Sequence, residues 1–235
     1  MNAGAVTVEV HWSRTVSAGS LLGRLTPREA DRAAALRTSQ ARDGIASSLV
    51  LARSAVGSWA GVDAGAVELH RRCPACGSRD HGLPSASWRT APDDLRRRVP
   101  PRLSLSRTGG LVVVAMTAGH PLGVDVERAG GVLTGLDGVA LASADARPAD
   151  DGERLRTWVR KEAVLKAAGR GLVVDPRALV LGPATAAPRI EDGPAGVLDR
   201  PWSLTDLDPV AGFVGALAVQ HAGPVRVELR EVPLA

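Results

Sequence analysis

Residues 158 to 166 read WVRKEAVLK, and residues 123 to 128 read GVDVER. The first segment holds both lysines of the chain, Lys161 and Lys166, although lysine and arginine together number 29. An ammonium group is a compact point charge, whereas a guanidinium group is a planar fork. Almost every cationic side chain of this protein is an arginine, yet this short segment contains two lysines. This distribution indicates that the segment needs the ammonium group of lysine.

The first segment lies in a predicted helix. Apolar residues recur at steps of three and four from Glu153 to Ala168. Glu162 and Lys166 stand four residues apart and share one helix face, where one could reach a metal ion and the other an anion. Glu-Lys pairs at this spacing are also common on exposed helices, so the pair alone does not define a site.

The second segment is predicted to be a strand. Its side chains alternate with period two, so the valines face one side while Asp125 and Glu127 face the other. Two carboxylates on one face repel each other unless a cation joins them, and a divalent metal ion would do so. The alternative is an amphipathic strand with both acids in water.

Composition limits the function classes. The chain has 235 residues, 45% of them hydrophobic and 23% charged, as in an ordinary globular protein of one large or two small domains. With 3% aromatic residues, stacking platforms for single-stranded nucleic acid are not expected. A formal charge of +4 suits a phosphate-bearing ligand or an acidic protein, or simply reflects arginine-rich codon usage.

Targeting signals are not apparent. The sequence contains no apolar run of about 18 residues, and residues 1 to 10 lack a basic start followed by an apolar block. We therefore expect a cytoplasmic protein without a membrane partner.

The segment from His70 to Pro84 contains both cysteines. Neighbouring cysteines in a reducing compartment are thiols or metal ligands more often than a disulfide. Cys73, Cys76, His70 and His81 could form a four-ligand zinc site, but the second pair of ligands is crowded compared with usual zinc motifs. We prefer a loop rich in proline and glycine.

The remaining periodicities place the other elements. Helices are expected from Thr26, where Thr26 and Glu29 form a capping box, and at Ile45 to Trp59 and Val139 to Ala146. Strands are expected at residues 5–12, 103–106, 111–116, 178–181, 213–220 and 225–229. The last three are expected to complete the sheet of the second half.

Taken together, GVDVE and WVRKEAVLK, with Lys161 placed 36 residues after Asp125, resemble the paired motifs of 4′-phosphopantetheinyl transferases. The closest type is the surfactin-synthetase-activating one, and the likeness is nearest to actinobacterial members. It extends over most of the chain through VEVHW, CPACGSRDHGLP, LSLSRTGG and GRGL.

This resemblance implies an α+β fold of two similar, pseudo-symmetric halves. Each half would be a small, mainly antiparallel sheet packed on a long helix, with the active site in the cleft between them. We place the halves at residues 1–120 and 121–235.

The resemblance also implies a reaction, the Mg²⁺-dependent transfer of the 4′-phosphopantetheine group from coenzyme A to a serine hydroxyl. Adenosine 3′,5′-bisphosphate would be released. The partners would be coenzyme A and an acidic acyl or peptidyl carrier protein, with no nucleic acid, and the chain would act as a monomer. The sequence does not specify whether the carrier serves fatty-acid, polyketide or nonribosomal-peptide synthesis.

The matching positions carry the expected roles. Mg²⁺ would be held by Asp125, Glu127 and Glu162, and the catalytic residues would be Glu162 and Lys166. The coenzyme A phosphates would be bound by Lys161, Lys166, Ser106, Arg107, Arg53 and Arg32.

Three positions depart from the family pattern. Arg107 replaces the usual histidine after Ser106, Leu83 replaces a cation between Gly82 and Pro84, and Gly44 falls where a phosphate-binding arginine is usual. Compensating cations could come from Arg28, Arg32, Arg42 or Arg53.

These departures motivate an alternative, a catalytically weakened relative that acts as a carrier-protein or nucleotide binding module. A third reading, a zinc-bearing nucleic-acid binder, rests on the basic charge and the Cys/His loop. It lacks a recognisable helix that could read a DNA groove.

Overall fold

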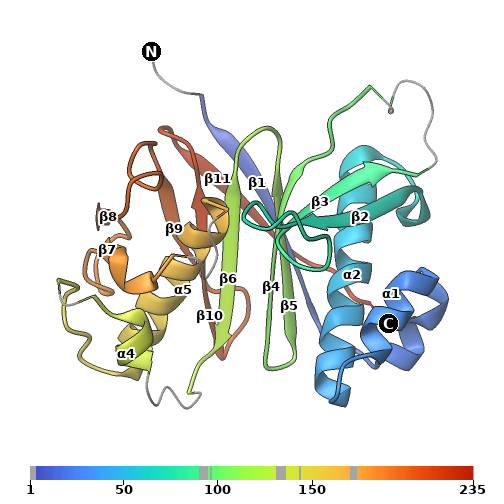
Figure 1. The fold of residues 1–235 in the computed structure, drawn as a ribbon, viewed down its shortest axis with the longest axis horizontal. Coiled ribbons are helices and arrows are strands. Elements are labelled where there is room, and N and C mark those ends of the chain that lie inside the picture. Colours follow the sequence, from blue (N-terminus) through green and yellow to red (C-terminus); the bar gives the residue numbers. More distant parts are fainter. Residues whose placement is uncertain are drawn as a thin grey trace.

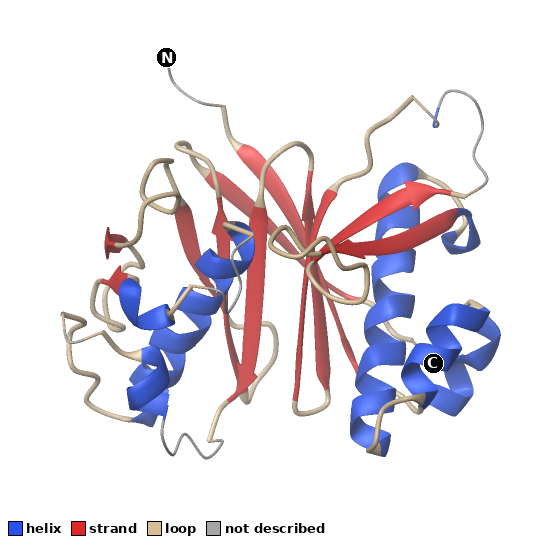
Figure 2. Ribbon diagram, viewed as in Figure 1, coloured by secondary structure: helices blue, strands red, loops and turns tan. Residues whose placement is uncertain are grey.

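The computed structural model describes residues 4–89, 95, 97–130, 136–142, 144–169 and 174–234. Residues 170–172 of the GRGL segment lie outside these ranges. The fold is mixed α/β with several small sheets. Figures 1 and 2 show the two long helices, α2 (Ser39–Ala60) and α5 (Asp151–Ala167), on opposite sides of the molecule, with strands of the two larger sheets between them.

The first sheet has the strand order β11-β1-β5-β4. Its strands are β1 (Val6–Arg14), β4 (Arg102–Thr108), β5 (Leu111–Thr117) and β11 (Val225–Glu231). Neighbouring strands are antiparallel except β1 and β11, which run parallel.

The second sheet has the order β6-β10-β9 and is antiparallel. It consists of β6 (Leu122–Arg128), β9 (Ser203–Leu207) and β10 (Phe213–Val219). Two further antiparallel pairs are β2 (Val67–Arg72) with β3 (Leu83–Trp88), and β7 (Val180–Leu181) with β8 (Ile190–Asp192).

The described helices are α1 (Pro27–Ala34), α2 (Ser39–Ala60), α4 (Leu136–Ala140) and α5 (Asp151–Ala167). Short 3-10 segments are η1 (Ala18–Arg24), η2 (Ala64–Ala66) and η4 (Pro176–Ala178). The predicted capping box of α1 is present, with Thr26 and Glu29 each bonding the other's backbone N–H. None of the described helices is both long and apolar enough to cross a bilayer.

Three apolar layers hold these elements in the order helix, sheet, sheet, helix. One face of β5, including Val112 and Val114, packs on α2, and the other face meets the second sheet. Val124 and Val126 of β6 belong to this middle layer. On the outer face of the second sheet, β10 packs against α5. The acidic side of β6 therefore faces the α5 side of the molecule, as the alternation of GVDVER predicts.

One strand lies in a different place from the one expected. Residues 225–229 do form a strand, β11, but it pairs with β1 in the first sheet and does not join the second. Parallel pairing requires a long connection, and its destination cannot be inferred from the local pattern. The helix expected at Val139 to Ala146 also differs, since α4 ends at Ala140.

Candidate active site

The two sheets meet where β4 lies beside β6, and side chains join them instead of a backbone ladder. Ser104 Oγ accepts a hydrogen bond from the Val124 N–H at 3.0 Å, and Ser106 Oγ accepts one from the Val126 N–H at 3.3 Å. Ser106 Oγ also donates to Asp125 Oδ1 at 2.8 Å. The serines stand two residues apart on one face of β4, so they meet alternate residues of β6.

The next hydroxyl of the same face extends this arrangement. Thr108 Oγ1 donates a hydrogen bond to Glu127 Oε2 at 2.6 Å. Ser106 and Thr108 thus each hold one carboxylate of the Asp-x-Glu strand. Both acids are oriented by the first sheet although they belong to the second.

Helix α5 crosses β6 at Gly123, where the backbones touch. A Cβ atom at Gly123 would lie 2.0 Å from the Ala163 oxygen and 2.5 Å from the Ala167 nitrogen. No residue other than glycine fits such an approach without moving the helix. The contact places Lys166 and Glu162 of α5 over the acidic side of β6.

Lys166 and Asp125 form the central ion pair. Lys166 Nζ lies 2.5 Å from Asp125 Oδ1 and donates to the Val124 oxygen at 3.2 Å. The Asp125 side chain is 6% exposed and that of Lys166 is 28% exposed. Two buried carboxylate oxygens, Asp125 Oδ2 and Glu162 Oε1, have no hydrogen-bond partner. Buried polar atoms are normally paired, so these two oxygens call for an explanation.

The three acids share one electrostatic environment. Burial raises the pKa of Glu162, with Asp125 and Glu127 raising it further and Lys166 opposing them. Burial also raises the pKa of Glu127, while the Thr108 hydroxyl and Lys166 act against the shift and Asp125 adds to it. The Lys166 ammonium group is thus the cation that acts on three neighbouring carboxyl groups. Since one positive charge does not balance three carboxylates, a further cation would be favoured in this cluster.

The carboxylate oxygens of the three acids do not lie close enough together to form a ready-made metal site. Within the described ranges, only Cys73, Cys76 and His81 bring three possible ligand atoms within 4.8 Å of one another. The carboxylates of Asp125, Glu127 and Glu162 stand further apart, with one Asp125 oxygen engaged by Lys166. A cation that bound all three acids would have to draw their side chains together.

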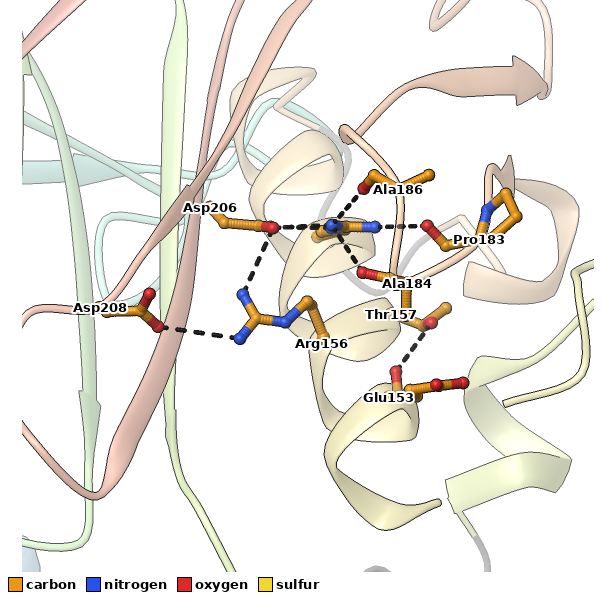
Figure 3. Close-up of polar contacts among 9 residues, drawn as sticks. Glu153, Arg156, Thr157, Pro183, Ala184, Ala186, Asp206 and Asp208 are labelled. Carbon is orange, nitrogen blue, oxygen red and sulfur yellow. Dashed lines mark hydrogen bonds and ion pairs between the residues drawn. The ribbon is translucent and has the colours of Figure 1, made fainter. Parts of the chain in front are cut away.

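The opposite face of α5 is anchored, which fixes the face that carries Glu162 and Lys166. Arg160 is buried and bonds both Asp206 carboxylate oxygens, at 2.8 and 2.7 Å. It also donates to three backbone oxygens of the loop after β7, those of residues 183, 184 and 186. Figure 3 shows Arg156 reaching Asp206 and Asp208 alongside this network.

Lys161 does not belong to the cluster around Lys166. It is 0% exposed and pairs with Asp145, which also accepts from the Leu181 N–H at 3.0 Å. Burial lowers the pKa of Lys161, and Asp145 counteracts that shift. We therefore correct our expectation for Lys161. In this structure it ties α5 to the chain around Asp145 and Leu181 and lines neither of the two cavities described below.

Arginines gather around a cavity of about 870 Å³ between α1, the middle of α2 and the β2–β3 pair. Its lining includes Arg28, Arg32, Arg53, Arg71, Arg72, Arg79 and Arg89, together with Glu29, Glu68 and Asp80. Burial and the neighbouring charges of Arg32 and Arg107 lower the pKa of Arg71 to about 10. Partial burial and Arg32 likewise lower the pKa of Arg107. Arg32, Arg71 and Arg107 thus repel one another, and an anion among them would relieve that repulsion.

Two of the departures from the family pattern are linked in space. A Cβ atom at Gly44 would lie 3.3 Å from Cδ of Arg107. The arginine of β4 therefore runs across the space that the glycine of α2 leaves open. The Arg107 side chain, which comes from β4, thus lies beside the position where the resemblance would place a cation on α2.

The other predicted phosphate ligands have protein partners. Arg53 is 5% exposed and forms an ion pair with Glu29, so its charge is already neutralised. Arg32 is exposed and donates to the Asp80 oxygen at 3.1 Å. The Ser106 hydroxyl donates to Asp125, so in this arrangement Ser106 positions a carboxylate.

A second cavity, of about 720 Å³, adjoins the first at Arg71, Pro84 and Leu105. Its lining includes Lys166, and the loop between β2 and β3 contributes Cys73 and His81. Both volumes fall within the range of about 300–1,000 Å³ typical of small-molecule sites. Lys166 therefore connects the acidic cluster to an open space.

Comparison with known proteins gives no further assignment. No protein-family model matches the chain, and no curated protein is significantly similar to it. The resemblance to phosphopantetheinyl transferases therefore rests on the sequence motifs alone.

Four residues that shape the site were not identified from the sequence: Ser104, Thr108, Arg71 and Gly123. The alternation Ser-x-Ser-x-Thr at 104–108 was a usable signal for the first two, because it places three hydroxyls on one strand face. Arg71 and Gly123 have no comparable local signal.

Proposed function

We propose that the chain transfers the 4′-phosphopantetheine group of coenzyme A to a serine of an acyl or peptidyl carrier protein, and that its active site lies between two related halves. One observation carries the proposal. Asp125 and Glu162 each keep a buried oxygen without a hydrogen-bond partner, in a cluster with Glu127 and Lys166 that adjoins the second cavity through Lys166.

The acidic cluster fits Mg²⁺. This hard ion prefers carboxylate and water oxygens, and two oxygens of the cluster are buried and unsatisfied. Asp125, Glu127 and Glu162 would hold the ion. Once bound, it would neutralise negative charge on the pyrophosphate of coenzyme A.

Lys166 supplies the positive charge that the protein itself contributes at the reacting centre. Its side chain is partly exposed and lines the second cavity, while its ion pair with Asp125 fixes its direction. During transfer, negative charge moves onto the bridging oxygen of the pyrophosphate, and an ammonium group placed there lowers the barrier. The serine Oγ–phosphorus bond forms as the phosphorus–bridging oxygen bond breaks, and Glu162 accepts the serine proton.

The arginines of the first cavity suit the nucleotide end of coenzyme A. Arg32 and Arg107 lie close enough to Arg71 to lower its pKa, and Arg32 also lowers the pKa of Arg107. A phosphate bound among these cations would offset their repulsion and accept charge-assisted hydrogen bonds. Because the two cavities adjoin, a ligand whose phosphates lie in the first can extend into the second. This arrangement accounts for binding without a cation at Leu83 or Gly44.

A mass-shift assay tests the proposal. Purified protein, coenzyme A and Mg²⁺ are incubated with several apo carrier proteins, and the carrier is expected to gain the mass of one phosphopantetheine group. The Glu162→Gln variant should remain folded and produce no gain, while Glu231→Gln, at an exposed position of β11, should behave as the native chain.

The mass-shift assay, combined with a binding measurement, also tests the alternative that the chain is a binding module. Arg53 and Arg32 are engaged by protein groups, which favours weak coenzyme A binding. Binding of coenzyme A or of a carrier by calorimetry, without any mass gain on the carrier, would replace the enzyme proposal with the binding module.

A further inference from the structure

The loop between β2 and β3 brings its two cysteines and its histidine together. It runs from Cys73 to Gly82, longer than the two to five residues usual for a hairpin. Sulfur atoms of Cys73 and Cys76 and a ring nitrogen of His81 lie within 4.8 Å of one another. Cys76 Sγ and His81 Nε2 are 3.4 Å apart.

The turn at the cysteines has the form of a metal knuckle. The Gly77 N–H donates to the Cys73 oxygen at 2.9 Å, and the Cys73 N–H donates to the Ser78 oxygen at 2.8 Å. Gly77 has φ +72°, a conformation that favours glycine directly after the second cysteine. The backbone is thus folded back so that Cys73 and Cys76 can face one ion.

Backbone amides also donate hydrogen bonds to the sulfur of Cys73. The donors are the N–H groups of Cys76 and Ala75. Amide donors to sulfur are the usual second shell of a metal-bound thiolate. Cys73 is the buried member of the pair, and Cys76 is exposed.

Close backbone contact fixes the histidine end of the loop. A Cβ atom at Gly82 would lie 2.4 Å from the carbonyl carbon of Arg72 and from Cys73 Cα. Gly82 therefore lets the chain after His81 lie directly against the end of β2. Both ends of the ligand set are held by backbone geometry.

We propose that Cys73, Cys76 and His81 bind one zinc ion and that a non-protein ligand completes its coordination. Two thiolates and an imidazole select zinc over magnesium, and three protein ligands leave a tetrahedral position open. His70 does not supply the fourth ligand here, because it is not in the group of ligand atoms that lie within 4.8 Å of one another, and its Nε2 lies 2.7 Å from Ser87 Oγ. The site differs in place and in ligand chemistry from the acidic cluster.

The zinc ion would fix one wall of the second cavity. Cys73 and His81 line that cavity together with Lys166. Leu83, two residues after His81, lies where a Cβ atom at Gly169 would meet it at 3.2 Å. Closing the loop with a metal therefore holds the start of β3 against the end of α5.

Metal content and affinity test this site without reference to transfer activity. The full chain, freed of any histidine tag, is loaded with zinc, dialysed and analysed for metal, and its affinity is measured by competition with a chromogenic chelator. One zinc per chain is expected. Cobalt substitution should give a tetrahedral visible spectrum with thiolate charge-transfer bands.

Matched variants show which residues bind. Cys76→Ser and His81→Gln should each weaken zinc binding at least about 10-fold, while His70→Gln should bind as the native chain does. Both affected residues are exposed, so their replacement should leave the fold intact by circular dichroism. Absence of stoichiometric zinc, a cobalt spectrum without thiolate bands, or unchanged affinity in His81→Gln would each overturn the proposal.

Discussion

Lys166 Nζ contacts two successive residues of β6, Asp125 through its carboxylate at 2.5 Å and Val124 through its backbone oxygen at 3.2 Å. The ammonium group thus joins α5 to the acidic strand while three carboxyl groups surround it. A guanidinium group could not make both contacts from the same point, since its donors are spread over a planar fork. This geometry accounts for a lysine in a chain that otherwise uses arginine.

Replacing Lys166 should slow transfer strongly, even when the positive charge is kept. We expect Lys166→Ala to lower kcat by about 10²–10³-fold, because a charge-stabilising donor is removed. Lys166→Arg should restore only a small part of that loss. Carrier mass gain over time measures both rates, and full activity in either variant would contradict the role assigned to the ammonium group.

Removing the Glu162 charge should stabilise the protein in the absence of metal. Burial raises the pKa of Glu162, so the folded protein keeps this proton to higher pH than the unfolded chain does. The resulting stability is present below the ordinary carboxyl pKa and is lost as pH rises through the raised value. In EDTA, Glu162→Gln should therefore melt about 2–4 °C higher than the native chain at about pH 8, the shift that about 1 kcal/mol produces.

The comparison at low pH provides the control for that measurement. At about pH 4 the native carboxyl is already protonated in the folded protein, so the two melting temperatures should converge. Glu231→Gln should show no difference at either pH, because Glu231 is exposed. If Glu162→Gln were less stable than the native chain at high pH, the charge of Glu162 would not destabilise the folded protein, and the prediction would be wrong.

Gly123 should tolerate no side chain. In Gly123→Ala the new Cβ would lie 2.0 Å from the Ala163 oxygen, so α5 must shift away from β6. We expect a loss of about 1–3 kcal/mol or more of unfolding free energy, as in overpacked cores. Denaturant unfolding measures it. Gly138→Ala in α4 has open space around its Cβ and should be neutral or slightly stabilising.

The buried pair of Lys161 and Asp145 should matter for stability. Lys161→Met leaves Asp145 buried without its cation and should cost about 3–5 kcal/mol. Adding Asp145→Asn should recover much of this, since the amide oxygen can still accept from the Leu181 N–H. Unfolding free energies of both single variants and the double variant give the coupling. Equal stability of Lys161→Met and the double variant would contradict the predicted coupling between Lys161 and Asp145.

Arg107 should act on coenzyme A affinity. We expect Arg107→Ala to raise KM for coenzyme A about 10-fold while kcat changes little, because a phosphate contact is lost without touching the acidic cluster. Stability should not fall, since the repulsion from Arg32 and Arg71 is relieved. Repeating the assay with 3′-dephospho-coenzyme A locates the contact, because the variant should lose less with that substrate if Arg107 binds the 3′-phosphate.

Local patterns predicted the elements better than their partners. The strand alternation around Asp125 and the helical spacing around Glu162 and Lys166 were confirmed because each depends on a few neighbouring residues. The capping box of Thr26 and Glu29 was confirmed for the same reason. Strands β3, β8 and β9 were missed, since they are short or carry few of the β-branched and aromatic residues that mark strands.

Contacts between distant segments could not be inferred. Lys161 and Lys166 look equivalent in the sequence, but five residues of helix turn them to different sides, one toward Asp145 and the other toward Asp125. The Arg107 side chain crossing Gly44 joins residues 63 positions apart. Whether a cation missing from one element is supplied by another depends on the assembled fold.

The last strand gives the chain an unusual order of assembly. Because β11 pairs with β1, the first sheet contains residues from both ends of the described chain. Leu234, close to the end of the described chain, also packs into the core beneath α2. During synthesis, the edge of β1 that pairs with β11 stays without its partner strand until residues 225–231 have left the ribosome. The N-terminal core can be completed only after the C-terminal sheet has been made.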